Sequence, residues 1–579
     1  MAGLLLVRAD DPAFADAAMA GARAQFGQHG FSDPFETALP GWRLLHAPHI
    51  IGGPESLLAR GEDLVAVAGT LTFDGMTGRP ALEALLDGIA LPEPDWSRIG
   101  GQFAALVRRG GRTFLLTDWF AAFQLFHDGA ARIFSTSLLA AAGALPRLSF
   151  DAQGVYEYAF NVVPIGDDTV FNELKLLGPD RLVELGEGGA AFHPLRKPLP
   201  AAPVEMAQEE RIARHRDRLM AVVGDHVRGF GDAVCCPLSG GLDSRLLLAA
   251  LRAHGVRPSV YVYGAASSPD VLFAKAIGAA EGFDVAWIDK SSYPRPAPED
   301  YAARVEANFQ QYDGLPVDGE IFESGANAWA RDLRHEGGRL AASGGCGEIY
   351  RNFFFLPARR ISAASVARTF FARYDPRDLT SAFDETAYLR RVEDKILDAL
   401  GRAGDRDTLP RALVEQIYPR VRCRSFFGRE ISLEGRYGAY LMPFLDHRVV
   451  AEAMTLPMPL KDAGRFEAAL LNAIDPALAR HPSAYGHDFT GPPGPRHRFD
   501  EWATRVRPPW LRQKSYALQR RLKRGPAATG LLAPDWLGRV VDLDYPAMRR
   551  FFRMDRIGDP DLLRRVAALE YLAGRLGVS

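Results

Sequence analysis

Hydrophobic residues follow a short alternating pattern through about the first 195 residues of the chain. The runs are brief and β-rich, and turn residues or helical periods such as 80–88 separate them. Alternation of this kind is typical of antiparallel sheets with one covered face. We therefore expect an α+β fold for this part, with strands at 3–8, 64–71, 103–107, 113–117 and 131–135.

The pattern changes after residue 205, where apolar runs no longer alternate. Continuous apolar segments are typical of parallel strands that are covered on both faces. Helical periods lie between them, which predicts a doubly wound α/β sheet whose ligands bind beyond the carboxyl ends of the strands. The expected strands are 233–238, 258–264, 283–289 and 338–343, and the expected helices 206–228, 245–252 and 270–282.

Proline and glycine mark the boundaries that we expect between domains. The segment 198–203 is rich in proline and alanine, as linkers are, and Gly491-Pro-Pro-Gly-Pro495 breaks the chain again. A basic helix at 512–524 follows, and a last helix starts with Asp559 as N-cap and Pro560 at its first position. The predicted division is a first domain at 1–195, a linker at 196–205, a second domain at 206–490 and a helical extension at 491–579.

Composition narrows the class of protein. The 579 residues are 47% hydrophobic and 24% charged, with a formal net charge of −2. This composition is ordinary for a globular protein and excludes a mainly disordered chain. We expect no nucleic-acid partner, since no global basic field exists, and no membrane partner, since no apolar window is long enough. A cytoplasmic location is expected. Four cysteines without paired spacing indicate neither a disulfide framework nor a zinc site.

The chemistry centres on one glycine-rich turn between an expected strand and an expected helix. Its two glycines permit a tight turn, while hydroxyls and the free N–H groups of the helix start are suited to phosphate oxygens. The turn has no Walker A lysine, which disfavours a GTPase or kinase-like ATPase. The residues expected to bind the nucleotide here are Ser239, Gly240, Gly241, Leu242, Asp243, Ser244 and Arg245.

Three segments of the second part resemble one family in the same order. Ser239-Gly-Gly-Leu-Asp-Ser244 resembles the pyrophosphate loop of ATP pyrophosphatases, Ser343-Gly-Gly-Cys-Gly-Glu348 stands where asparagine synthetases have Ser-Gly-Glu-Gly-x-Asp-Glu, and Met442-Pro-Phe-Leu-Asp446 resembles their Val-Pro-Phe-Leu-Asp. The resemblance implies an α+β amidotransferase-like sandwich followed by an α/β ATP-pyrophosphatase domain. Segments 100–106, 117–127 and 134–137 resemble the amidotransferase domain of that family.

Departures from the family matter for the expected function. The family hydrolyses glutamine with a cysteine at residue 2, whereas this chain has Ala2 and no cysteine before Cys235. We therefore interpret the first domain as catalytically silent. The family's catalytic lysine has no counterpart in 481–489, and Lys514 and Lys523 are the nearest substitutes. Among relatives without the cysteine, the chain is most similar to lasso-peptide macrolactam synthetases.

The resemblance implies ATP and Mg²⁺ as cofactors, with Asp243 as the carboxylate that ligates the metal. Glu348 either orients Mg²⁺ or accepts a proton from an attacking amine, and Gly344 and Gly345 contact the nucleotide. For both acids a structural role in a first helical turn is the competing interpretation. Arg245 and Arg351 are candidates for phosphate or a substrate carboxylate, and Tyr485 and His487 for an acid or base.

Several functions stay open at this point. The favoured one is adenylation of a peptide carboxylate for attack by an amine of the same peptide, with a leader-peptide protease and a recognition protein as partners. The alternatives are a small-molecule enzyme of the β-lactam-synthetase type, an ammonia-dependent amidating enzyme, and a non-catalytic scaffold. We expect the turn-rich segment 313–320 to line the acceptor pocket and 353–356 to belong to the core.

Overall fold

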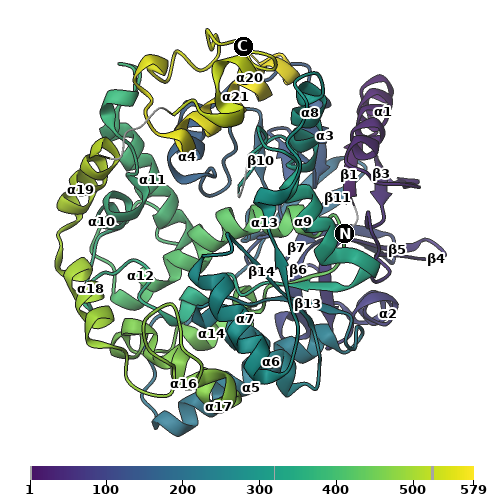
Figure 1. Cartoon of the computed structure of the whole chain (residues 1–579). Helices are drawn as coiled ribbons and strands as arrows, with labels where there is room; N and C mark the ends of the chain where they lie inside the picture. Colours follow the sequence, from purple (N-terminus) through teal and green to yellow (C-terminus); the bar gives the residue numbers. More distant parts are fainter. Residues whose placement is uncertain (1–2, 318–319, 523–526, 579) are drawn as a thin grey trace.

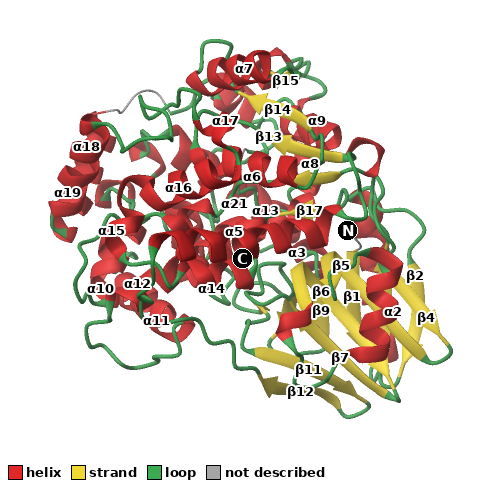
Figure 2. Cartoon of the chain, turned by 90° about the horizontal axis from the view of Figure 1, so that it is seen from below, coloured by secondary structure: helices red, strands yellow, loops and turns green. Residues whose placement is uncertain are grey.

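The computed structural model describes residues 3–317, 320–522 and 527–578. Its strands form two antiparallel sheets and one parallel sheet. In both views the antiparallel strands lie at one side of the molecule, and helices from the second half of the chain form the other side (Figure 1, Figure 2). The fold is therefore mixed α/β, with antiparallel and parallel sheets in separate parts of the chain, as the change in hydrophobic pattern predicts.

The two antiparallel sheets pack face to face between two helices. In β1 (Gly3–Arg8), Leu5 and Val7 pack against α1 (Pro12–Gln28), whereas Leu4 and Leu6 point into the core between the sheets. The second sheet covers its outer face with α2 (Gly78–Gly88). Period-2 alternation thus produces a layered sandwich.

The strands of the first sheet lie in the order β10 (Leu174–Leu176), β8 (Phe126–Asp128), β9 (Ile133–Ser135), β1, β3 (Trp42–Ala47) and β2 (Phe35–Leu39). Those of the second lie in the order β12 (Gly189–Pro194), β11 (Arg181–Gly186), β7 (Arg112–Thr117), β6 (Ile99–Arg109), β5 (Asp63–Phe73) and β4 (Leu57–Arg60). Two helices, α3 (Leu138–Gly143) and α4 (Ala152–Asn161), follow β9 in the chain.

The third sheet is parallel throughout. Its order is β15 (Val285–Ile288), β14 (Ser259–Tyr263), β13 (Val234–Pro237), β16 (Leu340–Ala342) and β17 (Tyr440–Leu441). The four expected strands are confirmed within two residues at each end. The fifth, β17, is too short for a hydrophobic pattern to reveal. Helices α5 (Gln208–Val227), α6 (Leu242–Ala253), α7 (Pro269–Glu281), α8 (Tyr301–Gln311) and α9 (Ala326–His335) alternate with the strands.

The rest of the described chain contains further helices, from four residues in α10 to 17 in α21. They are α10 (Ala363–Val366), α11 (Glu385–Ala399), α12 (Arg411–Ile417), α13 (Gly428–Glu434), α14 (His447–Ala453), α15 (Met458–Lys461), α16 (Arg465–Ile474), α17 (Pro476–Ala479), α18 (Pro495–Val506), α19 (Pro509–Leu522), α20 (Pro534–Leu537) and α21 (Pro560–Leu576). The predicted start of the last helix is confirmed, since Asp559 accepts hydrogen bonds from the N–H groups of Asp561 and Leu562. Among the described residues, no helix combines the length and the apolar character that crossing a bilayer requires.

One buried carboxylate connects the antiparallel sandwich to the rest of the chain. Asp313 accepts hydrogen bonds from the Ser137 hydroxyl at 2.6 Å and from the N–H of Leu138, which opens α3, at 2.7 Å. Its Oδ2 also lies 2.8 Å from Arg436 Nη2 and 3.5 Å from Arg429 Nη1. Burial alone would raise the pKa of Asp313, but the two arginines hold it well below its ordinary value. Segment 313–320 was expected to line an acceptor pocket, but Asp313 is fully buried and no described residue of the segment lines the cavity beside the glycine-rich loops. Pro316, Val317 and Glu320 line a separate cavity of about 530 Å³, and residues 318–319 lie outside the described residues.

We predict that Asp313→Asn lowers the free energy of unfolding by about 3–5 kcal/mol, because two buried guanidinium groups lose their counter-charge. Asp313 has φ +48°, a conformation that asparagine also adopts, so the substitution changes charge without backbone strain. The matched control is Asp16→Asn, which removes the exposed pair with Arg43 and should cost under about 1 kcal/mol. Urea unfolding of the three proteins measures both values, and equal costs would contradict the role of Asp313.

Candidate functional site

The two glycine-rich loops meet at the carboxyl ends of neighbouring strands. The loop 238–244 follows β13 and the loop 343–348 follows β16, and these strands pair in parallel with Val234 opposite Leu340. A Cβ on Gly347 would lie 2.1 Å from Asp243 Oδ1, and one on Gly344 would lie 3.0 Å from the Asp243 carbonyl carbon. Side chains at these positions would collide with the first loop, so the absence of side chains is what brings the loops together.

The first loop is closed by hydrogen bonds of its own. Ser239 Oγ and Ser244 Oγ are 2.8 Å apart, and Ser239 Oγ accepts from the N–H of Gly241 at 3.2 Å. The N–H of Gly240 donates to Asp270 at 2.9 Å, an acid at the start of α7 that sequence reasoning missed. The loop thus has the expected donors, and a bound phosphate would exchange these internal bonds for its own oxygens.

Arg245 differs from expectation. It points away from the loop, is fully buried, and donates to the carbonyl oxygens of His481 and Pro482 at 2.8 and 2.5 Å. Its guanidinium also lies 5.1 Å from the centre of the Phe489 ring. Because the first turn of α6 directs position 245 inward, this arginine holds the segment 481–489 in place and is not available to a phosphate.

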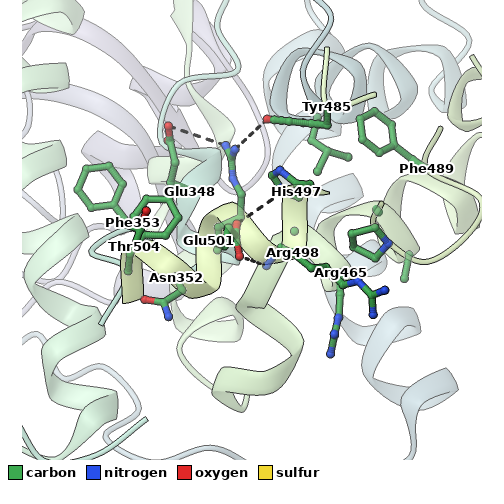
Figure 3. A pocket seen from close by; sticks show the side chains of 18 of the residues that line it. Glu348, Asn352, Phe353, Arg465, Tyr485, Phe489, His497, Arg498, Glu501 and Thr504 are labelled. Atoms are coloured by element: carbon green, nitrogen blue, oxygen red, sulfur yellow. Dashed lines mark hydrogen bonds and ion pairs between the residues drawn. The ribbon is translucent and has the colours of Figure 1, made fainter. Parts of the chain in front are cut away.

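Asp243 lies in the first turn of α6, whose N-cap is Gly241, and its carboxylate faces Arg351. Arg351 Nη2 donates to Asp243 Oδ1 at 2.6 Å and also contacts the second oxygen. The same guanidinium lies 3.8 Å from Glu348 and 3.2 Å from the hydroxyl of Tyr485, and dashed lines mark both contacts in Figure 3. It also lies 3.2 Å from Glu467. Arg351 is thus the shared cation of three carboxyl groups.

Glu348 lies in a single 3-10 turn, η4 (Gly347–Tyr350), and not in the α-helix expected there. Its carboxylate accepts a hydrogen bond of 2.6 Å from the hydroxyl of Tyr418. Burial, together with Cys423 and Glu348 nearby, raises the pKa of Tyr418 well above its ordinary value, so the phenol keeps its proton. The other predicted loop residues pack tightly, since a Cβ on Gly345 would lie 2.8 Å from the Phe427 ring.

A cavity of about 970 Å³ opens beside these groups. Glu348 and Tyr485 line it (Figure 3), as the sequence suggested for a site. Arg351, His487 and Leu242 of the first loop line it as well. Phe354 and Leu356 belong to the core, as expected for 353–356, while Phe353, Phe354 and Phe355 also line the cavity. The cavity is built largely from segments that lie far apart in the sequence: 348–355, 369–373, 463–473 and 485–512.

A buried lysine that the sequence did not single out lies behind the second loop and does not line the cavity. Lys461, on α15, is fully buried and donates to the carbonyl of Ile349 at 2.7 Å, next to Glu348, while Glu415 lies 2.9 Å away. Lys514 lies over the ring of Trp510 and is not among the cavity residues. Lys523 and Ala2 lie outside the described residues. Cys346 is buried, and burial raises the pKa of its thiol well above the ordinary value.

Sequence reasoning missed Glu467 and Tyr418. A signal for Glu467 existed, since it shares the apolar face of α16 with Leu470 and Leu471, and an acid on such a face needs a partner. Burial and the nearby Asp243 carboxylate raise the pKa of Glu467 well above its ordinary value. Tyr418 gives no signal of this kind, because it lies in the irregular π-helical segment η7 (Tyr418–Phe427).

Within the part of the chain that the structure describes, no cluster of three or more His, Cys, Asp or Glu side chains is arranged to hold a metal ion by itself. A magnesium ion that arrives with phosphates needs fewer protein ligands, typically one or two carboxylates. Asp243 and Glu348 supply oxygen donors of that kind, so the donor chemistry fits such an ion.

Comparison with known proteins finds little. No family model matches the chain, and no curated protein matches it. Several solved structures are similar to parts of it, among them the following two. One is the structure of the allosteric regulatory enzyme of purine biosynthesis, with 11% identity over 58% of this chain and 87% of that one, at a TM-score of 0.24. The other is the glutamine phosphoribosylpyrophosphate amidotransferase from B. subtilis complexed with ADP and GMP, with 9% identity over 68% of this chain and 79% of that one, at a TM-score of 0.21. Scores this low carry no argument about this chain.

We predict that Glu467→Gln gains stability relative to the parent protein as pH rises from about 5 to 8. A raised pKa means that folded Glu467 keeps a proton that the unfolded chain releases, so rising pH destabilises the parent by up to about 1.4 kcal/mol per pH unit. Glutamine removes this titration. Urea unfolding at pH 5, 6, 7 and 8 measures the difference, and a difference that is constant with pH would mean that Glu467 is ionised in the folded protein.

Proposed function

We propose that this protein is an ATP-dependent amide-bond-forming synthetase that adenylates a carboxylate, releases pyrophosphate and passes the acyl group to an amine. One observation supports the proposal most: the two glycine-rich loops meet at Asp243, beside Glu348 and a cavity of about 970 Å³. The loop donors suit phosphate oxygens, and the cavity has room for a second substrate next to them.

In this proposal Asp243 and Glu348 hold Mg²⁺ beside the phosphates. When bound, the ion neutralises charge that develops on the phosphate oxygens. Arg351 supplies a further positive charge and keeps the two carboxylates from repelling each other in the absence of ligand. Tyr485 orients Arg351 through its hydroxyl.

Glu348 also has the surroundings of a proton acceptor for the attacking amine. The Tyr418 hydroxyl donates to one of its carboxylate oxygens, which fixes the direction of the carboxylate. Glu348 also lines the cavity. Apolar residues such as Phe353 line the cavity beside it and help to exclude water, which would otherwise compete for an acyl adenylate.

For the amine we propose one that belongs to the same molecule, as in the macrolactam of a lasso-type peptide. The chain has no cysteine before Cys235 and all four of its cysteines are buried, so it offers no thiol for releasing ammonia from glutamine. An intramolecular amine has a high effective molarity and competes well with water. A small-molecule cyclisation, an ammonia-dependent amidation and a scaffold role are the competing functions.

We predict that the protein with Mg²⁺ and a cognate substrate converts ATP into AMP and pyrophosphate. Asp243→Asn should lower kcat by about 10²–10³-fold, because one charge-stabilising group of about 2–4 kcal/mol is lost in the transition state. Asp16→Asn serves as the matched control, since it makes the same change of charge in an exposed ion pair of α1. Chromatography of the nucleotides decides the outcome, and ADP with phosphate as products would rule out adenylation.

Mass spectrometry tests the bond that is formed. A candidate precursor peptide is incubated with ATP, Mg²⁺, the protein and any protease that a neighbouring gene encodes. Loss of one water from the core peptide is the expected result. Addition of ammonia or of a free amine would favour an amidating enzyme instead. Loss of water from a small β-amino acid, with none from any peptide, would favour the β-lactam-type function.

We predict no release of glutamate from glutamine above the buffer blank, because no exposed thiol is present among the described residues. An enzyme-coupled glutamate assay over several hours measures this. Release at enzymatic rates would show that the first domain is active and would return ammonia to the list of acceptors.

A further inference from the structure

Two arginines on the cavity wall face the same aromatic ring. Arg373 follows the π-helical segment η5 (Ala367–Phe371), and its guanidinium lies 4.2 Å from the centre of the Phe370 ring. The guanidinium of Arg422, from η7, lies 5.7 Å from that centre and 3.8 Å from the centre of the Phe426 ring. Two like charges are thus held close together over aromatic surface.

The charge of Arg422 has no carboxylate bound to it. Within residues 3–317, 320–522 and 527–578 its guanidinium makes no ion pair, and its hydrogen bond is a long one of 3.4 Å to the carbonyl of Asn161. Burial and neighbouring Arg373 lower the pKa of Arg422 to about 10, so it stays charged at neutral pH. Glu348, the acid that attracts it across the cavity, already binds Tyr418 and faces Arg351.

The cavity as a whole has an excess of positive charge. Among the residues that line it in the described chain, six are arginines and two are glutamates. A cleft with one sign of charge and apolar walls concentrates ligands of the opposite sign. The arginines are Arg351, Arg373, Arg422, Arg465, Arg498 and Arg512, and the glutamates Glu348 and Glu501.

The two arginines come from segments other than the glycine-rich loops, and side-chain contacts connect them to Glu348. A continuous line of contacts runs from Arg351 to Glu348 and from Glu348 to Tyr418. The Tyr418 ring centre is 4.1 Å from that of Phe353, which is 5.0 Å from that of Phe370. A molecule whose reacting group lies at Glu348 can therefore reach the two arginines only with another part of its structure.

We propose that Arg373 and Arg422, with Phe353 and Phe370, form an anion subsite for the substrate that is not ATP. The subsite takes a carboxylate or phosphate attached to an apolar or aromatic group, because guanidinium forks bind such oxygens in pairs and the rings contact the attached group. That the bound molecule is a substrate rests on the proposed function, whereas the binding of the anion does not. The substrate class is then an amphiphilic molecule with an anionic group in addition to the carboxylate that is activated.

Calorimetric titration with three probes tests the subsite without turnover. Phenyl phosphate and benzoate carry the two candidate anions, and benzyl alcohol is the neutral comparison. We expect at least one anion to bind about tenfold or more tightly than benzyl alcohol, and to lose about tenfold or more in affinity in Arg422→Gln and in Arg373→Gln. Arg422→Lys keeps the charge but not the fork, and should fall between. Arg368→Gln, an exposed position in η5 that does not line the cavity, should bind as the parent does.

Each outcome decides the proposal. Equal affinity in the parent, Arg422→Gln and Arg373→Gln, an equal loss in Arg368→Gln, or no binding of either anion at millimolar concentration would overturn it. Displacement of phenyl phosphate by ATP with Mg²⁺, but not by benzoate, would assign the arginines to nucleotide phosphates instead. Thermal unfolding checks that each variant folds, and Arg373→Gln carries the test if Arg422→Gln does not. If the parent binds the anions in this way but makes no AMP, the proposed function fails while the subsite stands.

Discussion

The buried carboxylate of Asp313 is the interaction on which the arrangement of the chain depends. It is a counter-charge for Arg429 and Arg436 and at the same time accepts hydrogen bonds at the start of α3, so the helix dipole and two guanidinium groups converge on it. Arg429 also donates to the carbonyl oxygens of Tyr312 and Leu315, but Asp313 is the carboxylate that faces both arginines. Arg429 lies in α13, directly after η7, and Arg436 follows α13, so the same carboxylate holds the end of the segment from which Tyr418 reaches Glu348.

The site follows a similar electrostatic rule on a smaller scale. Three carboxyl groups lie around Arg351, and burial and Asp243 raise the pKa of one of them, Glu467, well above its ordinary value. One cation thus balances the charge of these acids only in part. The remaining negative charge suits a divalent ion, and the arginines further along the cavity suit an anion. One cavity thus has acids that suit a cation and arginines that suit an anion, which favours a ligand that carries both charges.

The sequence predicts the parts of this molecule that depend on local pattern. The four longer strands of the parallel sheet, the turn at Gly240 and Gly241, and the cap at Asp559 are confirmed because each depends on a few neighbouring residues. Arg245 and Asp313 do not have the roles that the sequence predicts, because their contacts involve residues more than 100 positions away in the chain. Tyr418 and Lys461 were not predicted for the same reason, since nothing near them in the sequence indicates a contact with the second loop.

The walls of the cavity have separate origins in the chain. The two glycine-rich loops belong to strand ends of the parallel sheet, where a single added Cβ would cause a collision. The outer wall comes from α16, α18 and the segments beside them, where exposed side chains such as Arg465 and Arg498 have space around them. A substitution in the outer wall can therefore change which molecule fits while the loops stay intact. Such a scaffold can acquire new specificities through changes that the fold tolerates, one surface residue at a time.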